Sequence, residues 1–122
     1  MTIAVIAVIG VFFAGMGCYA LAAPDAIIRP FGVTLGSAVG RSEVRAVYGG
    51  FGVAIAGVLA YAAIAPEVRN GILIAVGAAL AGMALGRLVS AVVDERTAFY
   101  PNWLYFLVEG LAAAALFAIC AR

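Results

Sequence analysis

The chain has 122 residues, of which 67% are hydrophobic and 11% are charged, whereas a soluble globular domain is about half apolar and about a quarter charged. With a mean hydropathy of +1.20, this composition indicates a membrane protein. A net charge of +1 and the absence of histidine exclude a nucleic-acid partner held by a basic patch, histidine-ligated metal or haem centres, and Ser-His or Cys-His nucleophiles.

Four segments contain the roughly 20 apolar residues that a helix needs to cross the hydrocarbon core of a bilayer. The first covers residues 2–23 and stops before Pro24. Its Ala20-Leu21-Ala22 resembles a signal-peptide cleavage motif. However, no basic residue precedes the apolar run, and the run is long. We therefore expect a retained transmembrane helix.

The second span is predicted over residues 42–65, ended by Pro66. Ser42 is the expected N-cap, and Glu43 would then lie in the first helical turn, where the helix dipole favours an anion. The preceding connection, residues 24–41, is too short and too often interrupted by glycine and proline to span a membrane. We expect it to lie along the membrane interface.

The third and fourth spans are predicted over residues 71–93 and 102–121, with Asn70 and Asn102 as N-caps. The joins around them are short, which favours antiparallel neighbours. The predicted fold is therefore an all-α membrane protein, an up-down-up-down four-helix bundle that forms a single transmembrane domain over residues 1–122.

Small residues recur at helical spacing in the middle two spans. Gly49 and Gly52 lie on one face of the second span, and Gly82 and Gly86 form a GxxxG motif in the third. Small residues allow helices to approach closely in lipid. We expect packing within the chain, with dimerisation as the alternative use.

The predicted topology gathers charged and polar residues of three spans at one end of the bundle. Arg87 lies seven residues before Asp94, and Glu109 lies seven residues after Asn102. Both are therefore roughly 10 Å inside the membrane, at the same level of adjacent antiparallel helices. We predict that Arg87 and Glu109 are partners in one ionic cluster, whose expected members are Glu43, Arg45, Tyr48, Arg87, Ser90, Asp94 and Glu109.

Two interpretations of this cluster remain open at the level of the sequence. It can stabilise the bundle, although buried ion pairs often contribute little net stability. Alternatively, it can line a pocket, in the volume left by the nearby glycines, for a small amphiphile, a quinone or a lipid headgroup that accepts hydrogen bonds from Arg45 or Arg87. We predict no metal site, no resident cofactor and no catalytic residues.

The stretches "EVRAVYGGFGVAIAGVLA", "GRLVSAVVDER" and "FLVEGL" resemble the DoxX-like group of small four-helix membrane proteins. Within it, the chain most closely resembles an uncharacterised bacterial family known as domain of unknown function 4345. The resemblance covers essentially the whole chain and implies the four-helix bundle. DoxX itself is similar to a membrane subunit of a thiosulfate:quinone oxidoreductase, and more distant relatives include a receptor-assembly chaperone. The resemblance therefore implies an accessory role in the membrane and no particular reaction.

The sequence thus predicts a multi-pass protein of the bacterial inner membrane, of accessory or ligand-binding type and not an enzyme. One alternative is a structural subunit of a larger membrane complex or a homo-oligomer. Another is a small proton-coupled exporter, but such exporters carry a carboxylate on the first helix, and residues 2–23 contain no charge.

The arginines outside the spans predict the orientation. Arg29, Arg41 and Arg96 fall on one side of the predicted topology, and Arg69 and Arg122 on the other. Cytoplasmic loops carry an excess of arginine and lysine. The side with three arginines is therefore predicted to be cytoplasmic and both termini to be outside.

Overall fold

A computed structural model describes residues 1–120, and this part of the chain is helical and contains no strand. Four continuous helical stretches are long and apolar enough to cross a membrane, which confirms the number and approximate position of the predicted spans: Thr2–Ala22, Ala38–Ile64, Pro66–Val93 and Phe99–Cys120. The predicted end of the last span at Ala121 lies outside the described residues.

The helices divide into two compact units, and each is described by itself. The first comprises Met1 and Ile3–Ile64, and the second comprises Thr2 and the chain from Ala65 onward. The prediction that all four spans form one domain with up-and-down connections stays a prediction.

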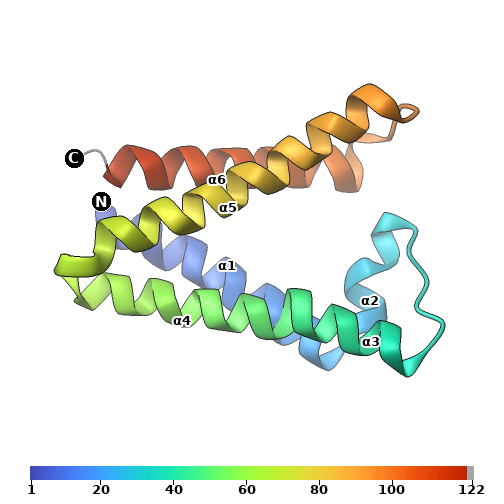
Figure 1. Ribbon diagram of the computed structural model, residues 1–122, viewed down its shortest axis with the longest axis horizontal. Coiled ribbons are helices and arrows are strands. Elements are labelled where there is room, and N and C mark those ends of the chain that lie inside the picture. The colour runs from blue at the N-terminus through green and yellow to red at the C-terminus, as the bar shows by residue number, and fades with distance from the viewer. Residues whose placement is uncertain (121–122) are drawn as a thin grey trace. The chain divides into compact units, whose positions relative to one another are not determined.

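The first unit is built on α1 (Thr2–Ala22) and a long helix formed by α3 (Ala38–Val44), the π-helical turn η2 (Arg45–Gly50) and α4 (Phe51–Ile64) (Figure 1). Residues of α1 contact residues of the long helix in reverse order of sequence. Gly10 faces Leu59, Gly17 faces Val53, and Leu21 faces Gly49. The two helices are therefore antiparallel.

The closest approach in this unit is at Gly17. A Cβ atom there would lie 2.7 Å from the backbone nitrogen of Val53 and 2.8 Å from the backbone oxygen of Gly49. Real Cβ atoms do not come this close to backbone, so only glycine permits this crossing. The prediction that Gly49 and Gly52 serve packing within the chain is confirmed, since both face α1.

The connection between these helices contains the short helix α2 (Pro24–Ile28) and the 3₁₀ turn η1 (Arg29–Phe31), which ends at Gly32 with a left-handed φ of 74°. The next helix begins earlier than predicted, because the hydroxyl of Ser37 accepts a hydrogen bond from the backbone N–H of Gly40 at 3.1 Å. Ser42 is consequently not an N-cap, and Glu43 lies beyond the first turn.

The second unit is a hairpin of α5 (Pro66–Val93) and α6 (Leu104–Cys120), joined through the kinked π-helical turn η3 (Phe99–Trp103) (Figure 1). Contacts pair Gly77 with Phe117 and Arg87 with Glu109, so these helices are also antiparallel. Buried residues on α5 follow a helical period: Leu73, Val76, Gly77, Leu80 and Ala84.

Two predicted N-caps in this unit are wrong. Pro66 is the first residue of α5 and not merely a stop signal for the helix before it, because proline lacks only an N–H that the first turn leaves unpaired. Asn70 therefore lies inside α5. Asn102 lies inside η3, and its side chain bonds to Arg87 and not to the backbone.

The GxxxG motif of α5 does not contribute to the packing of this hairpin. A Cβ atom at Gly82 or Gly86 would meet no atom within 4 Å. The glycine that packs against α6 is Gly77, where a Cβ atom would lie 2.9 Å from the ring of Phe117. The face of α5 that carries Gly77 is therefore the one that meets α6.

Candidate functional site

An ion pair between a buried and a half-buried side chain joins the two helices of the α5–α6 hairpin. Glu109 lies on the buried face of α6 with Ala113 and Leu116, and only 3% of it is exposed. Arg87 follows Leu80 and Ala84 at helical spacing, so it continues the buried stripe of α5. At the level where two apolar side chains would be expected to meet, the hairpin therefore holds two opposite charges.

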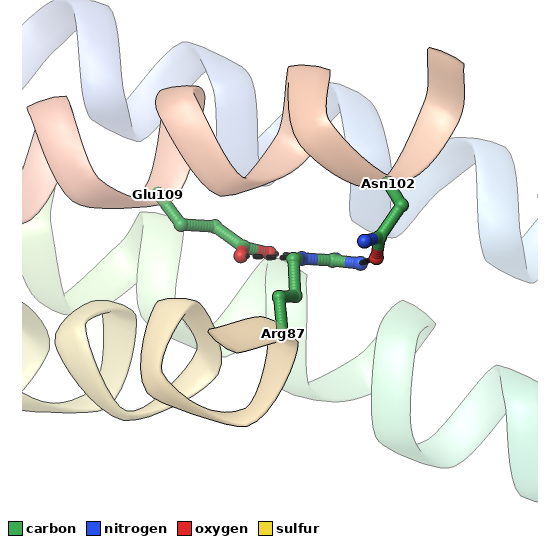
Figure 2. Close-up of polar contacts among 3 residues, drawn as sticks. All are labelled: Arg87, Asn102 and Glu109. Atoms are coloured by element: carbon green, nitrogen blue, oxygen red, sulfur yellow. Dashed lines mark hydrogen bonds and ion pairs between the residues drawn. The ribbon is translucent and has the colours of Figure 1, made fainter. Parts of the chain in front are cut away.

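The two side chains meet along parallel hydrogen bonds (Figure 2). Arg87 Nε donates to Glu109 Oε1 at 2.7 Å, and Arg87 Nη2 donates to Oε2 at 2.9 Å. This fork matches the planar guanidinium to both carboxylate oxygens and makes a strong charge-assisted contact. Among the described residues, every buried side-chain nitrogen and oxygen has a hydrogen-bond partner, so the pair satisfies the usual condition for burying charges.

Two further side chains surround the guanidinium. Arg87 Nη1 donates to Asn102 Oδ1 at 3.2 Å, and the guanidinium carbon lies 5.9 Å from the centre of the Tyr105 ring. The ring therefore supplies a cation–π contact. Beside it, Trp103 packs edge-to-face on Phe106 with ring centres 5.4 Å apart. Charge, amide and aromatic groups are thus gathered at the η3 end of the hairpin.

The orientation of Asn102 follows from the chemistry of its partner. A guanidinium carries only donors, so it must face the amide oxygen of Asn102. In Figure 2 the dashed line from Arg87 ends on the amide oxygen of Asn102 and not on the amide nitrogen. This nitrogen makes no hydrogen bond to any described residue. Since every buried side-chain nitrogen and oxygen among the described residues has a partner, this nitrogen is not fully buried. The ion pair thus holds an accessible N–H donor in a fixed position.

Arg87 and Glu109 both lie well inside their helices and not at the helix ends. Arg87 lies six residues before the end of α5 at Val93, and Glu109 lies five residues after the start of α6. At 1.5 Å per residue, each is roughly 8–9 Å inside its helix. A charge inside a membrane span is costly and faces a partner or a functional site. Arg87 and Glu109 face each other, as predicted from their positions in the sequence.

Ser90 and Asp94 do not join this pair among the described side-chain contacts. Both are exposed at the carboxyl end of α5. Asp94 is the C-cap, with an extended backbone at φ −107° and ψ 173°. It therefore leaves the helical face that it would share with Arg87. Asp94 therefore does not share the Arg87 guanidinium with Glu109.

The remaining predicted members belong to the first unit. Glu43 and Tyr48 are exposed. Arg45 is also exposed, and its Nε donates to the backbone oxygen of Leu21 at 3.0 Å, at the carboxyl end of α1. A single cluster uniting all seven predicted residues stays a prediction.

Two of the glycines that were predicted to leave room for a pocket, Gly49 and Gly52, leave none. The space beside Gly49 is filled by the side chain of Leu21, and the space beside Gly52 by α1 at Phe13, Met16 and Gly17. These glycines were expected to leave a cavity under the charges. Instead they admit a neighbouring helix.

Asn102 is the site residue that was misinterpreted from the sequence as a helix cap. A signal was present, because Asn102, Tyr105 and Glu109 follow the i, i+3, i+7 spacing of one helical face. Among the described residues, no group of three or more His, Cys, Asp or Glu side chains could hold a metal ion.

Four helices long and apolar enough to cross a membrane, with an ion pair between two of them, define the class: a small helical protein of membrane-spanning type. The family follows from comparison. The chain belongs to the family described as Domain of unknown function (DUF4345), whose model matches residues 1–120. Neither a curated protein nor a solved structure matches the chain.

Proposed function

We propose that this chain is an accessory integral membrane protein that binds the polar head of a small amphiphile beside the Arg87–Glu109 pair. The observation that carries the proposal is the accessible amide nitrogen of Asn102, which is held by Arg87 at the level of a buried charge pair. A donor fixed inside a span is complementary to a carbonyl oxygen. Quinones and ester-linked lipid headgroups both present such an oxygen.

Each residue of the proposed binding site has its own role. Glu109 neutralises Arg87 and fixes its plane through the two parallel bonds. Arg87 fixes the amide of Asn102 by occupying its oxygen. The rings of Tyr105 and Trp103 supply flat apolar surface near the donor, and a mostly apolar lining with few polar anchors is typical of small-molecule sites.

The wider architecture is proposed on physical grounds. Only Ala65 separates α4 from α5, and five residues separate α5 from η3. Such short joins favour consecutive spans of opposite direction. The proposal therefore includes an up-down-up-down order of the four spans, kinship with the DoxX-like group, and residence in a bacterial inner membrane with lipid as the surrounding partner.

A structural subunit of a larger membrane complex, or a homo-oligomer, is the second candidate function. It is favoured by the completeness of the ion pair, since a carboxylate bonded through both oxygens needs no ligand. The two candidates differ in what should accompany the purified protein. A ligand-binding protein retains a small molecule, whereas a structural subunit retains a defined protein partner or a second copy of itself.

The test uses the full chain purified from its native membrane in a mild detergent. Native mass spectrometry should show a bound carbonyl-bearing amphiphile on the wild type. Asn102→Asp keeps the oxygen that accepts from Arg87 and removes the amide donor, so the bound molecule should be lost. Asn70→Asp, at a distant position in α5, is the matched control and should retain it. Equal retention by all three proteins, or a protein partner and no small molecule, would contradict the proposal.

A further inference from the structure

The first unit carries a polar arrangement of its own, at the start of its long helix. Arg41 and Arg45 are four residues apart across the junction of α3 and η2, so they lie on one helical face. Tyr48, three residues further along, continues that face and is 40% exposed. The three residues form a stripe that is cationic at one end and aromatic at the other.

The charges of this stripe are not neutralised within the described residues. The acids of the first unit are Asp25 and Glu43, and neither forms an ion pair with Arg41 or Arg45 there. Glu43 lies two residues from each arginine and therefore faces elsewhere. Two like charges four residues apart on a helix repel each other. An anion between the two guanidinium groups would remove that repulsion.

Arg45 is held ready for such an anion. Its Nε donates to the backbone oxygen of Leu21 at 3.0 Å, and the side chain of Leu21 fills the space beside Gly49 one turn further on. The guanidinium is thus tied to the carboxyl end of α1, where backbone oxygens favour a cation. Its Nη groups make no hydrogen bond to described residues, and the side chain is exposed.

The length of the helix places the stripe at the edge of a bilayer. The stretch Ala38–Ile64 has 27 residues, or about 40 Å at 1.5 Å per residue, whereas the hydrocarbon core is about 30 Å thick and takes about 20 residues. Counted back from the apolar end at Ile64, about 20 residues reach Arg45. The guanidinium groups then lie at the level of lipid phosphates, and Tyr48 lies at the level of the acyl chains.

We propose that Arg41 and Arg45 bind the phosphate of an anionic phospholipid headgroup, with the lipid chains lying along Tyr48. Arginine suits this role because its planar fork donates two hydrogen bonds to phosphate. A phospholipid is favoured over free phosphate because the aromatic end of the stripe has no counterpart in an inorganic ion. This site is independent of the amphiphile proposed beside Asn102, which belongs to the other unit.

The test titrates the purified full chain with phosphatidylglycerol and with phosphatidylcholine in neutral detergent, and native mass spectrometry counts the bound lipids. The wild type should bind phosphatidylglycerol more tightly than phosphatidylcholine. Arg41→Gln should weaken the binding of phosphatidylglycerol about tenfold, the loss expected for one charge-assisted contact. The Arg41 side chain makes no hydrogen bond or ion pair to the described residues, so this change should preserve the fold. Arg45→Gln should act in the same direction.

Arg96→Gln removes an arginine of the second unit and is the matched control, which should leave the affinity unchanged. Equal loss in Arg96→Gln would mean that only net charge matters and would overturn the proposal. No loss in Arg41→Gln and Arg45→Gln would also overturn it. A third arm adds inorganic phosphate to the wild type. Competition at millimolar phosphate that depends on Arg41 would show a general phosphate site and would overturn the assignment to a lipid.

Discussion

Half-buried Arg87 and buried Glu109 meet on facing helices, and the guanidinium and carboxylate are joined by bonds of 2.7 and 2.9 Å. An apolar pair would fill the same positions without the cost of removing charges from water. Within a span, such a pair therefore points to a role besides packing. The proposed role is to hold the amide of Asn102, and several consequences can be measured.

Replacing Glu109 by Gln should leave Arg87 without its anion inside the span. Breaking a buried pair in this way costs on the order of 3–5 kcal/mol in the free energy of unfolding. The double change Arg87→Met with Glu109→Leu should cost much less, because it removes both charges and leaves apolar groups of similar size. Equilibrium unfolding in detergent measures both. Arg87→Met and Glu109→Leu, each measured alone, complete the cycle; a loss of stability in the double variant equal to the sum of these two single losses would show that the residues are not coupled.

Arg87→Lys should separate the effect of charge from that of geometry. Lysine keeps the positive charge but cannot donate in a planar fork to both oxygens of Glu109 and also to Asn102. We expect a loss of about 1–3 kcal/mol, below that of Glu109→Gln. The same unfolding measurement applies. A stability equal to the wild type would mean that Glu109 requires only a nearby cation.

Gly17→Ala should weaken the first unit. The added methyl would lie 2.7 Å from the backbone nitrogen of Val53, so the two helices must separate. Overpacking of this kind costs typically about 1–3 kcal/mol. Gly15→Ala is the matched control, because a Cβ atom there meets nothing within 4 Å. Its thermal denaturation midpoint should stay the same or rise, since alanine is the better helix former. Equal midpoints for both variants would contradict the close crossing.

The ends of α5 offer a test of the membrane topology. Glu67 and Glu95 flank this helix, so a cysteine at each should react from opposite sides of the membrane. The background carries Cys18→Ser and Cys120→Ser. With a reagent that cannot cross the membrane, added outside intact cells, Glu67→Cys should be labelled and Glu95→Cys should not. Labelling of both would mean that α5 does not span, and the reverse pattern would invert the predicted orientation.

The four spans could be predicted because long apolar stretches are a strong signal in the sequence. The exact residues at which the helices begin could not be predicted. Composition alone located the four apolar stretches. Ser37 and Ser42 are the same residue type, and only the local backbone decides which hydroxyl reaches an N–H of the first turn. Pro66 was interpreted as the end of one helix, although proline is equally suited to the first turn of the next.

The candidate site was predictable in part for a similar reason. Counting residues from the helix ends brought Arg87 level with Glu109, because a helix rises by a fixed distance per residue. The same counting placed Ser90 and Asp94 on the face of Arg87. It could not show that the backbone at Asp94 turns away. Nor could it show that α1 fills the space beside Gly49 and Gly52, since that contact joins residues far apart in the chain.

The most direct test of the proposed site uses the single tryptophan of the chain. Trp103 is the neighbour of Asn102 and packs on Phe106, so a quinone bound to the amide should quench its fluorescence. Titration of the purified protein with a short-chain benzoquinone should give saturable quenching in the wild type and in Asn70→Asp. In Asn102→Asp the saturable part should disappear. Quenching that rises linearly without saturation, or that saturates equally in all three proteins, would contradict a carbonyl-binding site beside the Arg87–Glu109 pair.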